Sequence, residues 1–192
     1  SEGAVRAQGY LEWKKAEELD ELLRIRQVVS GAQTLQELVE TLARELPVLN
    51  IRRCYLSLYV DPQEPIKGAR LVLAYDETRR YTEREGQVFS PSWRLTPLGL
   101  EADQPQNLVV YPLYYRDEQL GFISLDARTF QGRVHQLLCE QVSSALKSVL
   151  LVEQNLQLYH QALEAQHVAE EANLLKSRFL SMVSHELLTP MV

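Results

Sequence analysis

The longest stretch of this 192-residue chain without proline or glycine begins just after Gly132 and continues to Leu188. These two residue types end helices most often, so their absence from a helical pattern predicts one continuous helix. Its length would be roughly 85 Å, at about 1.5 Å per residue. With 45% hydrophobic and 24% charged residues, the chain is long enough for one globular domain with a core plus extended helices.

Apolar side chains recur along this predicted helix at the alternating spacing of three and four residues that is typical of a parallel coiled coil. The seam consists of Val142, Ala145, Val149, Val152, Leu156, Tyr159 and Leu163. Because such a seam needs a partner, we expect a parallel homodimer. The contacts predicted for it are Val142, Val149, Val152, Leu156, Tyr159 and Leu163.

A second apolar seam follows at Val168, Ala172, Leu175, Phe179 and Met182. The step from Leu163 to Val168 is five residues, which no heptad supplies, so the register breaks at 164–167. Two interpretations remain open at this point. Either the break is a switch between two packings of similar energy, or the two seams simply belong to two different packing environments.

Two helices are predicted before any strand. Residues 10–30 show helical spacing of apolar residues among charged ones, and Gly31 ends this amphipathic segment. Thr34 and Glu37 then form a capping-box pattern that opens a second helix, which Pro47 closes.

The spacing of apolar residues then changes from about four to two, which indicates strands. We expect strands at 54–60 and 70–75, and a weaker one at 87–89. Residues 90–107 contain three prolines and are predicted to form a loop. Two further strands, 108–115 and 120–126, are separated by polar residues 116–119, as in a tight antiparallel hairpin.

This order of elements resembles a GAF domain. The most specific part is Val109-Val110-Tyr111-Pro112-Leu113 followed by Leu120-Gly121-Phe122-Ile123, since the last two GAF strands commonly carry a Pro-Leu pair and then an opening glycine. The resemblance implies an α+β fold, in which an antiparallel sheet has its N- and C-terminal helices on one face and a long parallel coiled-coil helix follows. A PAS domain is the alternative, but its elements normally come in a different order.

The resemblance also bears on cofactors and pockets. Neither the cysteine motif of bilin-binding GAF domains nor the signature of cyclic-nucleotide-binding ones is present, so we expect no cofactor in this fragment. Cys54 and Cys139 lack metal-ligand spacing and are predicted to be buried thiols. Aromatic and basic residues of the hairpin and loop could line a small-molecule pocket, although packing of the sheet and loop is the favoured interpretation. They are Trp93, Arg94, Tyr111, Tyr114 and Tyr115.

The end of the chain resembles the HisKA-type phosphoacceptor box of sensor histidine kinases. The matching residues are Phe179, Met182, Ser184, His185, Glu186, Leu187, Thr189 and Pro190. The resemblance implies that His185 accepts the phosphoryl group, that Glu186 is its base and that Thr189 helps to dephosphorylate the receiver. A neutral imidazole is a better nucleophile when a base takes its other ring proton. Leu188 departs from the pattern, because these proteins usually carry arginine there.

This second resemblance implies a partner protein and a larger parent. A histidine kinase needs a second hairpin helix and an ATP-binding domain, and the boxes of that domain are not found in these 192 residues. We therefore expect an input-side fragment that is inactive alone, with ATP and Mg bound by the catalytic domain of the parent. The parent would also bind a response-regulator receiver domain. The expected organisation is an amphipathic helix (1–31), a GAF-like domain (32–150), a signalling coiled coil (151–176) and a truncated phosphotransfer helix (177–192).

Charge and hydropathy limit the other partners. The net charge of −6 disfavours a nucleic-acid backbone or an anionic membrane, either of which needs a concentrated basic face. No apolar run reaches the roughly 18 residues needed to span a bilayer, so we expect a cytoplasmic fragment without a membrane segment. Two alternative functions remain open, namely a non-catalytic dimeric scaffold and a small-molecule receptor.

Overall fold

The computed structural model describes residues 8–10, 12–13, 16, 20, 23–24, 26–27, 29–92, 94–96, 107–127 and 132–188. The contacts within the chain divide it into two compact units, Ser1–Leu150 and Leu151–Val192. The helix predicted over 10–30 lies partly outside the described residues. Those that are described between 8 and 27, and residue 29, have helical backbone.

Helix α2 spans Leu35–Glu45 and begins at the predicted capping box. The Glu37 backbone N–H donates to Thr34 Oγ1 over 3.1 Å, and the Gln33 N–H donates to the Glu37 carboxylate over 2.8 Å. The first bond satisfies an N–H group that the first helical turn leaves without a backbone acceptor, and the second ties the residue before the N-cap to the helix. The helix is capped at Leu46, directly before Pro47, so both predicted ends are confirmed.

Five strands follow in the predicted order, with the short helix η1 at Thr82–Arg84. They are β1 (Cys54–Tyr59), β2 (Ala69–Tyr75), β3 (Val88–Phe89), β4 (Leu108–Tyr115) and β5 (Glu118–Asp126). They form one antiparallel sheet in the order β3-β2-β1-β5-β4. The central strand β1 therefore pairs with β2 on one side and with β5 on the other.

The hairpin between β4 and β5 is tighter than the sequence indicated. Tyr115 pairs with Glu118, so the connection is the two residues Arg116 and Asp117 rather than the four residues 116–119. Arg116 adopts left-handed backbone with φ 56°, which permits this short turn. Glu118 and Gln119 consequently belong to β5, and the polar character of residues 116–119 did not show where the turn ends.

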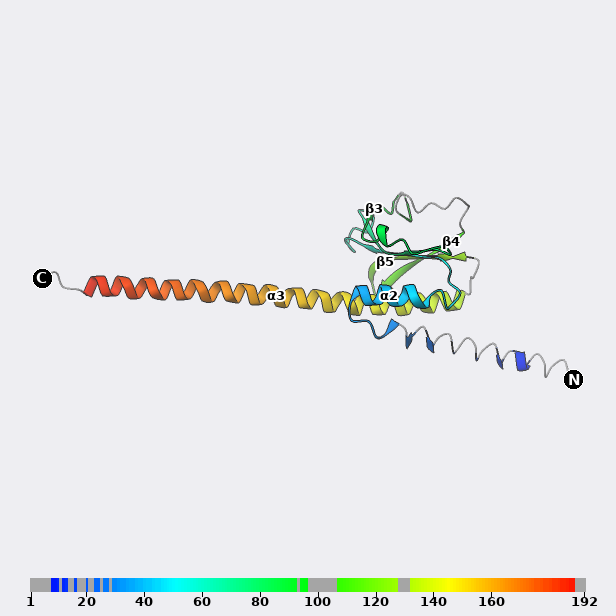
Figure 1. Cartoon of the computed structure of the whole chain (residues 1–192), viewed down its shortest axis with the longest axis horizontal. Coiled ribbons are helices and arrows are strands. Elements are labelled where there is room, and N and C mark those ends of the chain that lie inside the picture. The colour runs from blue at the N-terminus through cyan, green and yellow to red at the C-terminus, as the bar shows by residue number, and fades with distance from the viewer. Residues whose placement is uncertain are drawn as a thin grey trace. The chain divides into compact units, whose positions relative to one another are not determined.

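The main core lies between the sheet and two helices. Helix α3 spans Gly132–Leu188, and its part up to Leu150 packs with α2 on one face of the sheet (Figure 1). The fully buried side chains of this core include Leu38 and Leu42 of α2, Leu56 of β1, Ile123 and Leu125 of β5, and Val142 and Leu146 of α3. The predicted α+β arrangement, with an antiparallel sheet and helices on one face, is thus confirmed.

The opposite face of the sheet is also buried at its centre. Tyr55, Leu71 and Ala74 form a second cluster there, joined by the partly buried Tyr81, Phe89 and Leu108. Strand β1 is therefore buried on both faces, although its residues alternate between apolar and polar. Its polar positions are occupied by Tyr55 and Ser57, which are as inaccessible as their apolar neighbours.

The predicted homodimer contacts need one correction. Val142 and Val149 are 0% and 1% exposed within the chain itself, so neither can meet a partner. Helical spacing alone does not distinguish a seam that packs on the chain's own sheet from one that awaits another helix. In the unit from Leu151 onward the other predicted contacts, Val152, Leu156, Tyr159 and Leu163, are exposed, each by 46% or more.

Candidate functional site

The candidate site lies at the C-terminal end of α3, from residue 177 onward, within the second compact unit. Residues 177–187 are helical, and all of them except the partly buried Val183 are exposed. The local reason is that no proline or glycine occurs in this stretch before Pro190, and that good helix formers such as Leu180, Met182 and Leu187 occur in it. His185 and Glu186 therefore both present their side chains on an open helical surface.

Five side chains surround one shallow hollow on this surface, namely Arg178, Ser181, Met182, His185 and Glu186. The spacing explains why they meet. Ser181 precedes His185 by four residues and Met182 precedes Glu186 by four, so each pair is adjacent on the helix. Arg178 lies seven residues before His185, two turns away on nearly the same face. The hollow thus combines an imidazole, a carboxylate, a guanidinium and a hydroxyl.

Two of the predicted site residues, His185 and Glu186, are brought together in this hollow. Adjacent helical side chains diverge by about 100°, so Glu186 flanks the imidazole rather than facing it across a turn. The third, Thr189, lies outside the described residues, as does Pro190. Leu188 is the last residue of α3.

The two cysteines lie in the core, as expected. Burial raises the pKa of the Cys54 thiol above its ordinary range and raises the pKa of Cys139 to about 12. Both thiols are therefore protonated at neutral pH, and a protonated thiol is a poor nucleophile and a poor metal ligand. Among the described residues no group of three or more His, Cys, Asp or Glu side chains could hold a metal ion.

The hairpin aromatics mainly pack the sheet. Tyr111 and Tyr115 pack against the main core, whereas Tyr114 is exposed. Trp93 lies outside the described residues, and Arg94 is exposed. The partner of Tyr111 was not predicted from the sequence. It is His135 on α3, a buried histidine in edge-to-face contact with the tyrosine ring. Only the helical phase of His135, shared with Leu138 and Val142, could have indicated that it faces the sheet.

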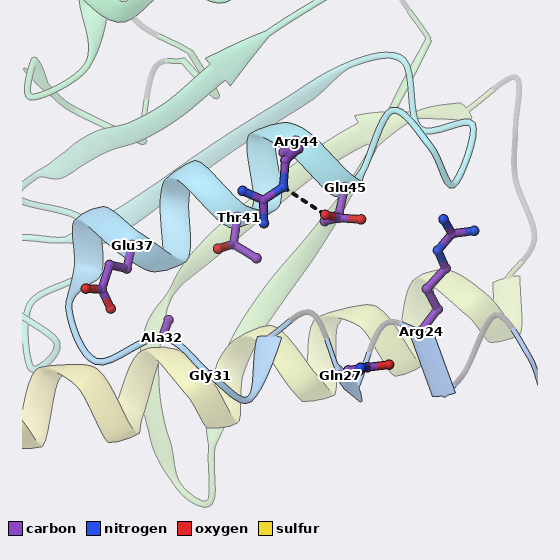
Figure 2. Close-up of a pocket in the computed structure, with 8 residues that line it drawn as sticks. All are labelled: Arg24, Gln27, Gly31, Ala32, Glu37, Thr41, Arg44 and Glu45. Carbon is purple, nitrogen blue, oxygen red and sulfur yellow. Dashed lines mark hydrogen bonds and ion pairs between the residues drawn. The ribbon is translucent and has the colours of Figure 1, made fainter.

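A polar cleft of about 520 Å³ lies between the N-terminal helical residues and α2 (Figure 2). Its charged groups do not converge on one point, as Figure 2 shows. The Arg44 Nε donates to Glu45 over 2.9 Å, and the Glu37 carboxylate already accepts from the Gln33 backbone. Because Glu37, Arg44 and Glu45 have local partners and acidic and basic groups are mixed, the cleft offers no concentrated charge of one sign for a ligand.

Two hydroxyl groups are buried on the sheet face opposite the helices. Ser57 of β1 and Ser124 of β5 are both 0% exposed, and neither Oγ has a hydrogen-bond partner among the described residues. Register places Ser124 opposite Tyr55 and Phe122 opposite Ser57, so the two serines are diagonal neighbours. A buried hydroxyl without a partner costs about 1 to 3 kcal/mol, so this pair is a place where a water molecule or another polar group would be stabilised.

Among the described residues, no helix is both long enough and apolar enough to cross a membrane.

Comparisons with known proteins identify the fold. No protein-family model matches the chain, and no curated protein matches it. Among solved structures, the chain is similar to the GAF domain of an Acinetobacter phosphoenolpyruvate-protein phosphotransferase, with a TM-score of 0.54 and 17% identity over 71% of this chain and 96% of that one. It is also similar to residues 122 to 287 of a methyl-accepting chemotaxis protein, with a TM-score of 0.51 and 17% identity over 69% of this chain and 99% of that one. The fold is therefore GAF-like.

Proposed function

We propose that this chain is the input and signal-transmission part of a two-component sensor histidine kinase. The observation that carries the proposal is the exposed pair His185 and Glu186 on a helical surface, inside a motif that continues to Thr189 and Pro190. An accessible imidazole is needed, because it must meet both ATP and a receiver domain. His185 is the phosphoacceptor in this proposal, Glu186 the base and Thr189 the residue that helps to dephosphorylate the receiver.

The chemistry assigned to these residues is phosphoryl transfer. A ring nitrogen of His185 attacks the γ-phosphorus of ATP, ADP leaves, and Glu186 accepts the proton of the other ring nitrogen. ATP and Mg would be bound by the catalytic domain of a longer parent protein, where the metal neutralises charge on the leaving phosphates. The residues of this chain position the nucleophile and hold its proton, and we propose that a cytoplasmic receiver domain then takes the phosphoryl group.

Dimerisation is the second part of the proposal. The exposed seam residues Val152, Leu156, Tyr159 and Leu163 would lie against the same residues of a second copy in a parallel coiled coil. Each such side chain gains about 1.5 to 3 kcal/mol when it is fully removed from water. The GAF-like fold of the preceding domain, which a chemotaxis protein shares, supports a role in signal input. The domain would act on His185 through this paired helix.

The experiment that tests the function uses the parent kinase, comprising this chain and its ATP-binding domain, incubated with radiolabelled ATP. Phosphate that is stable to base and labile to acid would support the proposal, since phosphohistidine has this stability. A dimeric protein that incorporates none, while its ATP-binding domain demonstrably binds nucleotide, would favour the alternative of a non-catalytic scaffold.

A small-molecule receptor is a second candidate, favoured by the two unsatisfied hydroxyls of Ser57 and Ser124. A ligand with hydrogen-bonding groups on this sheet face would satisfy both of them. Native mass spectrometry and visible absorption of the purified chain test the idea. We expect a colourless chain with no retained nucleotide or cofactor, and a bound species that is lost in the Ser57→Ala and Ser124→Ala variants would instead establish the receptor.

A further inference from the structure

The charge around His185 differs from the arrangement that the phosphoacceptor motif implies. Leu188 occupies the sequence position where these kinases usually carry arginine, so the motif of this chain lacks that cation. Phosphoryl transfer builds negative charge on the leaving phosphates and depends on nearby positive groups to stabilise it. The hollow itself contains one cation, Arg178, which lines it together with Ser181 and His185.

The helix places Arg178 on the His185 side. Seven residues rotate the chain by almost two full turns, so the two side chains lie on one face, about 10.5 Å apart along the axis. Ser181 lies between them, three residues after Arg178 and four before His185. A guanidinium can extend over several ångströms of this interval, and the serine hydroxyl supplies a donor part of the way along it.

The sequence gives Arg178 no acidic partner three or four residues away on the helix. An arginine on a helix normally pairs with acids three or four residues away, but the residues at those distances from Arg178 are Leu174, Leu175, Ser181 and Met182. The nearest acids in sequence are Glu171 and Glu186, seven and eight residues away. The Glu186 carboxylate lines the same hollow, but it stands eight residues from Arg178, so the guanidinium has no acid at the usual helical spacing.

We propose that Arg178, assisted by Ser181, binds the non-transferred phosphates of ATP while His185 attacks the γ-phosphorus. This inference rests on the proposed function and names a substrate-binding residue for it. A triphosphate whose γ-phosphorus meets His185 carries its other two phosphates several ångströms away, and Arg178 is the cation that lines the same hollow as His185. Arginine is suited to this role because its planar guanidinium can donate two parallel hydrogen bonds to phosphate oxygens.

The test measures autophosphorylation of the parent kinase at a series of ATP concentrations. Arg178→Ala should raise the KM for ATP about tenfold or more, as expected for the loss of a charge-assisted hydrogen bond, with a smaller change in kcat. Arg178→Lys should recover part of this loss, because lysine keeps the charge but not the bidentate geometry. Ser181→Ala should have a weaker effect in the same direction.

Lys176→Ala is the matched control. Lys176 is an equally exposed cation on the same helix, but two residues from Arg178 and so on the other side. The KM of the Lys176→Ala variant for ATP should stay within about twofold of the wild-type value, because salt screens a distant exposed charge. Equal effects of Lys176→Ala and Arg178→Ala would show a non-specific charge effect and would overturn the assignment.

Two further outcomes separate the possible failures. A normal KM for ATP in Arg178→Ala, with slower transfer to the receiver, would overturn the nucleotide assignment and place Arg178 in a protein interface instead. If the wild-type protein incorporated no phosphate from ATP, the proposed function itself would be refuted. Labelling of the wild type at His185 with identical kinetics in Arg178→Ala would leave the proposed function standing and reject only the inference about Arg178.

Discussion

The Tyr111 hydroxyl lies 3.4 Å from Nδ1 of His135, and the two rings meet edge to face with centroids 5.8 Å apart. This contact joins β4 to the first turn of α3, so it ties the sheet to the helix that carries the candidate site. His135 is 1% exposed, and burial lowers its pKa below the ordinary 6.5 because the charged form loses its hydration. The histidine is therefore neutral in the folded domain at neutral pH.

We predict that the domain loses stability as the pH falls from 7.5 to 5. Below pH 6.5 the unfolded chain binds a proton at His135, whereas the folded chain binds it only when the pH reaches the lower pKa of the buried histidine. Between these two pKa values a fall in pH therefore favours unfolding. One histidine can contribute at most about 1.4 kcal/mol per pH unit. Urea unfolding at several pH values measures the slope.

His135→Gln should flatten this slope, whereas His160→Gln, which changes an exposed histidine on the same helix, should leave it unchanged. Asp76 does not interfere. Burial raises the pKa of the Asp76 carboxyl, but hydrogen bonds from Thr78, Tyr81 and Arg79 lower it to about 2. The contribution of Asp76 to stability is therefore lost only near and below pH 4. An unchanged slope in His135→Gln would contradict the account of this histidine.

Gly121→Ala should destabilise the domain by about 3 kcal/mol or more. A Cβ atom at this position would lie 2.0 Å from the Ser57 carbonyl oxygen and 2.8 Å from Leu58 Cα, and both are backbone atoms of the central strand that cannot move aside. Gly31→Ala is the control, because a Cβ there meets nothing within 4 Å. Chemical denaturation of both variants checks the difference, and equal stabilities would show that β1 and β5 do not approach so closely.

Leu156→Glu should convert a dimer to a monomer at micromolar concentration. Leu156 is 56% exposed in the single chain, and a glutamate there would bury two like charges at the seam. Light scattering gives the mass, and Gln157→Glu, which adds the same charge off the seam, should remain dimeric. Val149→Glu should instead unfold the domain, since Val149 lies in its core. A wild-type chain that is monomeric under these conditions would argue strongly against the paired helix.

Periodicity predicted most of the fold because local patterns here agree with the final packing. The capping pair Thr34 and Glu37, the period of two in β1 and the long run after Gly132 each produced the element expected. Tertiary partners were not predictable in the same way. The spacing of Val142 and Val149 is equally suitable for a partner helix and for the sheet, and only the folded chain shows that the sheet covers them.

The candidate site was predictable to a different extent. His185 and Glu186 are adjacent in a local motif, so the sequence alone located them. Arg178 is two turns away and lines the hollow only because the chain is helical there. The phosphoacceptor motif itself assigns no role to this residue. The buried hydroxyls of Ser57 and Ser124 depend on strand register and on what covers the sheet, neither of which is local.

Substitutions around His185 should separate the proposed roles in the parent kinase. Glu186→Gln should slow autophosphorylation by roughly 10²-fold or more if the carboxylate is the base. Thr189→Ala should spare phosphorylation and impair removal of phosphate from the receiver, and Leu188→Arg should raise the rate or leave it unchanged. The initial rate of labelling and the rate of receiver dephosphorylation distinguish these variants, and a normal labelling rate in Glu186→Gln would exclude the base assignment.

The most direct test of the central claim is the site of acid-labile phosphate in the parent kinase after incubation with ATP, mapped by mass spectrometry under basic conditions. The account predicts phosphate on His185, complete loss of labelling in His185→Gln, and normal labelling in His160→Gln and His167→Gln, which change exposed histidines of the same helix. Undiminished acid-labile phosphate in His185→Gln would contradict the account, because no other histidine of this chain is followed by a glutamate and, three residues later, a threonine.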